Sequence, residues 1–304
     1  MKFKISREGG NDHINYFFSN LTEYLDYLEG QSISKIFKNH KLSSVTGNFS
    51  FTGTGSYDEA MRLCREGEYS DAFDKFDKER IKFESVLEQR RKRQKIVSDI
   101  AGFTPNVPKY LQGHPQNMFN TQRSVQTQKP IIKLYYNFSA NAFVSKEQLY
   151  ARGIFTLALI KELEQNNFAV ELNVFELTSC DNQYLSTVIR LKDANAPINY
   201  RAVFFPFANP SFLRRIYFRF TEIEPHLTED WVFGYGRACD LSEVKEYYKI
   251  NDNIMRFVIG KPDELGLTGE ITEKEYEKFI KEIGIKSILE SIENKDNGNN
   301  GRSD

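Results

Sequence analysis

The sequence predicts an α/β fold: a mixed, mostly parallel three-layer sheet of the Rossmann-like type, preceded by a helical N-terminal region. Ile131–Phe138, which follows Pro130, is rich in β-branched and aromatic residues and favours a buried strand. Lys146–Gln165 carries apolar residues at helical spacing, and Phe168–Leu177 is a second apolar run. A strand, a helix and a strand in this order predict a right-handed βαβ unit.

Composition bounds the class of protein. The 304 residues are 40% hydrophobic and 27% charged, enough for a packed core, and the net charge of −1 gives no general attraction to nucleic acid or anionic membranes. The cysteines, Cys64, Cys180 and Cys239, lack metal-binding spacing, so we expect free thiols in a reducing compartment. We find no signal peptide and no run approaching the roughly 18 apolar residues of a membrane span. These features predict a cytoplasmic protein with no membrane partner.

Residues 1–101 form the predicted N-terminal helical region. Apolar residues at spacings of three and four predict helices, and Ser56 with Glu59 three residues later predicts a capping box. The expected elements are helices over Ile14–Leu28, Ser56–Arg65 and Ser70–Ile96, and a short strand in Asn48–Gly55.

Three further segments complete the predicted organisation. Residues 102–129, broken by prolines, read as an extended linker, residues 130–293 as the α/β domain, and residues 294–304 as a polar, disordered tail. The short polar turn after Leu177 predicts an antiparallel hairpin. We expect strands over Leu185–Leu191 and Ile254–Ile259, and helices over Pro210–Thr221, Leu241–Tyr248 and Glu273–Ile283, the last capped by Thr272. Tyr200–Phe207 fits a helix or a strand, and we favour the helix.

The loop after the first core strand is the candidate ligand site. Ligands of α/β sheets bind beyond the carboxyl ends of strands. Side-chain oxygens there could hold a hard divalent cation, although weakly, because none belongs to a carboxylate. The alternative is that they make turn and cap hydrogen bonds to the backbone. The candidates are Asn137, Ser139, Asn141 and Ser145, of which Ser139 and Asn141 are the possible metal ligands.

Two basic clusters are candidates for a nucleic-acid interface. The first closes the long N-terminal helix, and the second is interleaved with aromatic residues that could stack on bases. The alternatives are a solvated helix end, favoured by the helix dipole, and a helix with an apolar core face. The candidate residues are Arg90, Arg91, Arg93, Arg214, Arg215 and Arg219.

No catalytic motif stands out from the background. The sequence lacks an HExxH motif, a GxSxG motif and a P-loop, and the four histidines share no ligand spacing. We therefore name no catalytic residue. An enzyme whose site is assembled from distant residues remains one hypothesis.

Four segments together resemble a family of tailed-phage proteins of unknown function. They keep the family's order and two signatures, Arg152-Gly153 and Pro210-Ser211. The resemblance implies a phage or prophage origin, hence the cytoplasm of the host cell, and no assigned activity. The segments are Asn48–Gly67, Pro105–Met118, Ile131–Glu176 and Phe205–Phe220.

The α/β unit also resembles a von Willebrand factor A-type domain. There the first strand ends in an Asp-x-Ser-x-Ser metal-ion-dependent adhesion site, and this sequence has Asn137, Ser139 and Asn141 at those places. Only Ser139 matches, and the loss of the Asp argues against a metal. The resemblance favours a non-enzymatic protein-interaction module whose partner is another phage or host protein. A nucleic-acid-associated protein of phage genome metabolism is the alternative.

Overall fold

The computed structural model describes residues 1–47, 52–67, 71–90, 96–100, 104–121, 129–140, 144–250 and 255–289. The chain divides into two compact units. One consists of Met1–Arg80 with Pro130–Asp304, and the other is Ile81–Lys129.

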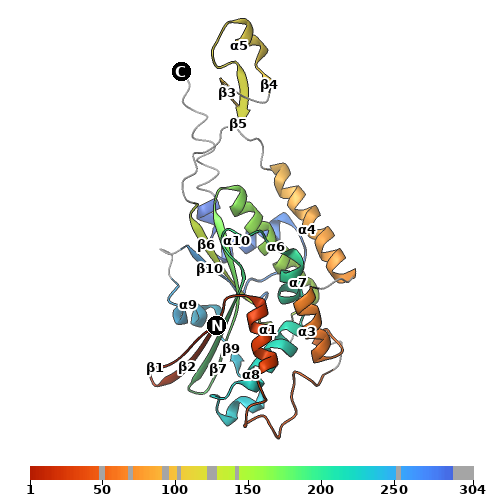
Figure 1. Cartoon of the computed structure of the whole chain (residues 1–304), viewed down its shortest axis with the longest axis vertical. Coiled ribbons are helices and arrows are strands. Elements are labelled where there is room, and N and C mark those ends of the chain that lie inside the picture. Colours follow the sequence, from red (N-terminus) through yellow and green to blue (C-terminus); the bar gives the residue numbers. More distant parts are fainter. Residues whose placement is uncertain are drawn as a thin grey trace. The chain divides into compact units, whose positions relative to one another are not determined.

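The predicted βαβ unit is confirmed. Strand β6 (Ile131–Asn137) is followed by helix α6 (Lys146–Gln165) and strand β7 (Ala169–Cys180). β6 and β7 pair in parallel over the full length of β6. Ser145 begins α6 with a capping box, its hydroxyl accepting from the Gln148 N–H. In the larger sheet the two strands of this unit lie between β8 and the edge strand β10 (Figure 1).

The sheet of the first unit has the order β1-β2-β8-β7-β6-β10, with β9 paired to β7. Three strand pairs are parallel (β6–β7, β6–β10 and β2–β8) and three are antiparallel (β1–β2, β7–β8 and β7–β9). The sheet is therefore mixed, as predicted, and the hairpin of β7 with β8 is confirmed, but parallel pairs do not dominate. The remaining strands are β1 (Lys2–Glu8), β2 (Asn11–Phe18), β8 (Gln183–Lys192), β9 (Arg237–Ala238) and β10 (Arg256–Ile259).

The helix predicted over Ile14–Leu28 is wrong in its first half. Ile14 lies in β2, and helix α1 spans Leu21–Gly30. Buried Ile14, Tyr16 and Phe18 alternate with less buried residues, which is the period of a strand. Asn20 then caps α1 by accepting from the Glu23 N–H. The N-terminal region therefore contributes two strands to the sheet and is not wholly helical.

The next two helices follow the prediction more closely. Helix α3 (Tyr57–Glu66) has Ser56 as its N-cap and Gly67 as its C-cap. The Glu59 carboxylate accepts from the Gly55 N–H, one residue before the expected capping-box partner. Helix α4 (Asp71–Arg90) ends before the predicted Ile96, which lies in a strand of the second unit. Of the strand predicted in Asn48–Gly55, residues 48–51 lie outside the described part, and the described remainder is not a strand.

The extended linker predicted over residues 102–129 is wrong in its described part. These residues contribute to a small three-stranded sheet of order β3-β5-β4 with a short helix. Asn106 caps that helix by accepting from the Lys109 N–H, so the polar, proline-rich stretch encodes short elements. The elements are β3 (Ile96–Asp99), β4 (Thr104–Pro105), α5 (Val107–Leu111) and β5 (Met118–Thr121).

The later helices agree with the prediction, with one difference. The helix expected after Asn209 starts as a π-helix, η1 (Phe212–Tyr217), and continues as α8 (Phe218–Ile223). The other predicted helices are α7 (Tyr200–Ala208), α9 (Leu241–Tyr247) and α10 (Glu273–Glu282), which Thr272 caps. The structure adds a 3-10 helix that the sequence analysis did not predict, η2 (Glu229–Phe233). Residues 294–304, predicted to be disordered, lie outside the described part.

Helices pack on both faces of the larger sheet (Figure 1). On one face Tyr136 of β6 stacks on Phe207 of α7, with ring centres 4.1 Å apart. On the other face Phe175 of β7 belongs to a cluster with Val244 of α9. No helix in the described ranges has both the length and the apolar character needed to cross a bilayer.

Candidate functional site

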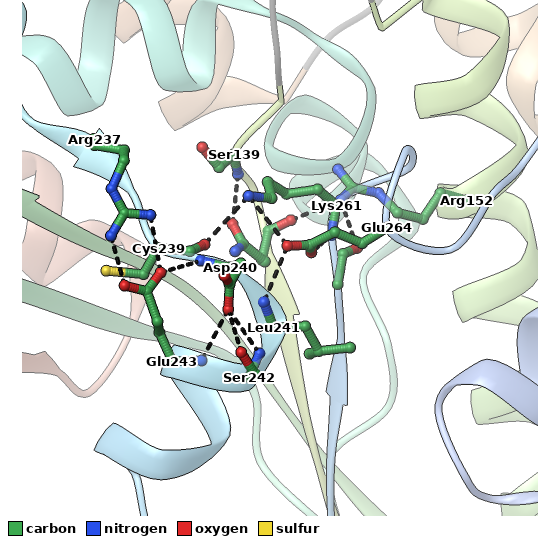
Figure 2. A network of polar contacts seen from close by, with 12 residues as sticks. Ser139, Arg152, Arg237, Cys239, Asp240, Leu241, Ser242, Glu243, Lys261 and Glu264 are labelled. Atoms are coloured by element: carbon green, nitrogen blue, oxygen red, sulfur yellow. Dashed lines mark hydrogen bonds and ion pairs between the residues drawn. The ribbon is translucent and has the colours of Figure 1, made fainter.

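Buried polar side chains gather where the parallel strands β6 and β10 end, beside the middle of β7 (Figure 2). We call this group the strand-end cluster. Five of its members have at most 5% of their surface exposed, and Glu264 is half-buried. Buried polar groups need partners, so each member's hydrogen bonds show its role. The members are Asn137, Ser139, Arg152, Glu176, Lys261 and Glu264.

Arg152 of α6 joins the ends of two strands. One terminal nitrogen of its guanidinium donates to the backbone carbonyl of Asn137, at 2.8 Å, and to that of Gly260, at 3.0 Å. The guanidinium also lies 4.3 Å from the centre of the Tyr136 ring. Burial lowers the pKa of Arg152. Arg152 thus fixes β6 against β10 at their carboxyl ends, where ligands of α/β sheets bind.

Glu176 is the acidic side chain of the cluster that lacks hydrogen-bond partners among the described residues. It is fully buried, and neither carboxylate oxygen has a hydrogen-bond partner of good geometry within the described residues. Burial raises the pKa of Glu176 to about 8, despite the lowering effect of nearby Ser139 and Lys261. Near neutral pH this carboxyl is therefore largely protonated.

Lys261 places a buried positive charge beside Glu176 and Glu264. Its ammonium lies 3.1 Å from a carboxylate oxygen of Glu264 and donates to the Cys239 carbonyl at 3.2 Å. The Glu264 carboxylate also accepts from the backbone N–H groups of Lys261 and Leu241, at 2.8 and 3.0 Å. Figure 2 shows this network at the beginning of α9. In the described ranges no three His, Cys, Asp or Glu side chains are grouped so as to hold a metal ion.

The structure brings two of the four ligand-loop candidates together. The Asn137 side-chain oxygen accepts from the Ser139 backbone N–H at 2.8 Å, and both residues are buried. Ser145 lies apart from them and caps α6. Asn141 lies outside the described residues. Asn137 and Ser145 therefore make the turn and cap hydrogen bonds of the alternative interpretation.

The basic candidates of the second cluster do not share one surface. Arg215 is fully buried and donates to the backbone carbonyls of Ser44 and Thr54, at 3.0 and 2.9 Å. It holds the preceding loops in place and is unavailable to a phosphate. Arg219 lies over the Tyr57 ring, 4.7 Å from its centre, whereas Arg214 lines a pocket.

The first basic cluster lies mostly outside the described residues. Arg90 is the last residue of α4, while Arg91 and Arg93 are not described.

A pocket of about 210 Å³ lies beside the strand-end cluster, and we call it the loop pocket. It is formed by the loop after β6, the start of α6, the end of α7 and the start of η1. Two cationic side chains, Lys146 and Arg214, line it, and none of its lining residues is acidic. Its apolar wall includes Phe138, Leu149, Phe207, Pro210 and Leu213.

Sequence reasoning missed Arg152, Glu176, Lys261 and Glu264 as members of one site. A usable signal existed for two of them. Arg152 interrupts the apolar stripe of a helix, and Glu176 interrupts an apolar strand, and a charge at a core position needs a partner or a function. Lys261 and Glu264 follow a short strand in a polar loop, so nothing in their pattern marks them.

Comparison with known proteins identifies a family of unknown function. The model of a family described as a domain of unknown function, DUF7192, matches residues 5–287, so the chain belongs to this family. No curated protein matches the chain, and no solved structure matches it.

Proposed function

We propose that this DUF7192 protein is a non-enzymatic protein-interaction module whose loop pocket binds an acidic segment with an apolar side chain. One observation carries this proposal: a pocket at the carboxyl end of β6 has an apolar wall, and its charged lining residues are both positive, Lys146 and Arg214. Ligands of α/β folds bind at this end of the sheet.

The volume of the loop pocket limits the size of the ligand. About 210 Å³ is below the roughly 300–1,000 Å³ of pockets that enclose a drug-sized molecule. One large apolar side chain with a neighbouring carboxylate fits this volume better than a nucleotide or a large cofactor. A carboxylate from Asp, Glu or a chain terminus would meet the exposed ammonium of Lys146.

The strand-end cluster gives the pocket a rigid base. Arg152 fixes the ends of β6 and β10, and Ser145 fixes the start of α6, so the pocket walls are in place before the ligand arrives. In this proposal the domain is a degenerate A-type domain in which the ammonium of Lys261, beside Glu264, supplies the positive charge of a bound metal ion. The antiparallel hairpin after the βαβ unit supports that relationship.

The proposal extends to the biological setting through the resemblance to tailed-phage proteins. The protein would act in the host cytoplasm, and its partner would be another phage or host protein.

A random octapeptide library with free carboxyl ends, selected against the purified protein, tests the proposal. We expect selected peptides to share a large apolar residue next to Asp, Glu or the terminal carboxylate. Lys146→Glu should weaken binding of these peptides at least tenfold, because it reverses one of the two charges of the pocket. The matched control is Lys35→Glu, an exposed lysine elsewhere. Basic consensus peptides, or equal loss in the control, would refute the proposal.

A further inference from the structure

Strand β1 forms one edge of the larger sheet, and its outer side is unpaired among the described strands (Figure 1). Six of its seven residues are exposed. Phe3 and Ile5, on the face that carries α1 and α8, are 43% and 44% exposed. An exposed edge strand with apolar side chains offers backbone N–H and C=O groups to another strand.

The strand itself is held firmly. It pairs with β2 along its whole length, and the Phe3 ring lies 4.6 Å from that of Tyr16. The edge is therefore a preformed template, which an incoming strand can extend without first ordering it.

We propose that β1 pairs antiparallel with β1 of a second copy of this chain, about a two-fold axis at Ile5. The charge pattern of the strand argues for this occupant. A two-fold axis perpendicular to the sheet keeps each side chain on its own face and pairs residues whose numbers have an even sum. With the axis at Ile5, all seven residues find partners: Lys2 faces Glu8, Phe3 faces Arg7, Lys4 faces Ser6, and Ile5 faces itself.

Neighbouring registers are worse. Moving the axis to Lys4 places Lys4 opposite its own copy, and like charges in direct opposition are unfavourable. Moving it to Ser6 keeps two ion pairs, those of Lys4 with Glu8, but leaves Lys2 and Phe3 without partners in the strand. Among these three registers, only the one centred on Ile5 combines two Lys–Glu ion pairs with both apolar residues inside the paired segment and no like charges in direct opposition. A foreign strand without a matching acidic residue would meet the lysines unpaired, which is how edge lysines discourage other partners.

The expected dimer is weak. One pair of seven-residue strands buries less than the roughly 1,200–2,000 Å² of a stable interface, so the dimer should appear only at high protein concentration. The association does not involve the loop pocket, so its test is independent of the proposed function.

Disulfide trapping in the full chain tests the register. Cys180 is first replaced by Ser, because it is partly exposed while Cys64 and Cys239 are buried. Ile5→Cys should then form a cross-linked dimer on mild oxidation, since directly opposite Cβ atoms lie about 4.5–5.5 Å apart. The controls Lys4→Cys and Ser6→Cys should stay monomeric, because each would be two residues from its copy. Cross-linking of either control in place of Ile5→Cys overturns the proposal.

Charge reversal tests the ion pairs in solution by sedimentation equilibrium. Lys2→Glu should raise the dissociation constant about tenfold, since two cross-strand pairs become repulsive, and Glu8→Lys should do the same. The double variant exchanges the charges and should restore the wild-type value. A wild-type chain that is monomeric at every concentration, or a double variant no better than the singles, overturns the proposal and leaves the edge to a strand of another protein.

Discussion

Replacing Glu176 by Gln should remove a steep pH dependence of stability. The side chain is fully buried, and burial raises its pKa from an ordinary 4.5 to about 8. Between these values the folded protein keeps a proton that the unfolded chain has lost. The stability that this proton gives is complete below about pH 4.5 and is lost as the pH rises through about 8.

The magnitude follows from the size of the shift. One pH unit in this window corresponds to about 1.4 kcal/mol, so between about pH 5.5 and 7.5 Glu176 should lower the free energy of unfolding by about 3 kcal/mol. Other groups titrate in the same range, which is why the difference between wild type and Glu176→Gln is the informative quantity. Gln has nearly the same shape and cannot ionise.

Urea unfolding of both proteins at several pH values measures this difference. As the pH rises, the free energy of unfolding of the wild type should fall relative to that of the variant, until the wild type is the less stable of the two. Glu176→Leu, which also cannot ionise, should show the same change of slope whatever its own stability. Parallel pH profiles for wild type and both variants would show that Glu176 is already ionised in the folded protein, paired with Lys261, and the reasoning would fail.

Two further substitutions test local packing, and urea unfolding measures both. Ser145→Ala should lower stability by about 1 kcal/mol through loss of the α6 cap, while Ser145→Asp should retain it, and equal losses in both variants would contradict a capping role. Gly153→Ala should lower stability by about 1 kcal/mol, because a Cβ there would lie 3.2 Å from the Phe76 ring and 3.3 Å from the Phe207 Cβ, and overpacking should outweigh the better helix propensity of Ala. A more stable Gly153→Ala would mean that the neighbouring rings move aside without cost.

The sequence predicts the centre of the fold better than its edges, for a physical reason. Lys146–Gln165 was predicted to its first and last residue because a capping residue and a long apolar stripe define it together. The N-terminal error arose because Ile14, Phe17 and Leu21 are spaced by three and four although the first two lie in a strand. Over so few residues the two periods overlap, and the pairing of β2 with β1 and β8 decides between them.

The sequence predicts where the candidate site lies but not which residues form it. The carboxyl end of β6 follows from the βαβ unit alone, but Lys261 reaches it from more than a hundred residues away. Such a contact is set by the strand order, in which β10 returns to lie beside β6. No local pattern carries that information, so Lys261 and Glu264 could not be joined to Asn137 from the sequence.

The same contacts separate residues that hold the fold from residues that can serve a ligand. The Arg152-Gly153 signature has a structural explanation at each position: the arginine satisfies two buried strand-end carbonyls, and the glycine admits the rings of Phe76 and Phe207. A residue pair needed for packing says nothing about a partner. Lys146 is different, because it is exposed at the start of α6, where the helix dipole disfavours a positive charge. A cation at an electrostatically unfavourable position in the lining of this pocket is the stronger reason to expect an anionic ligand there.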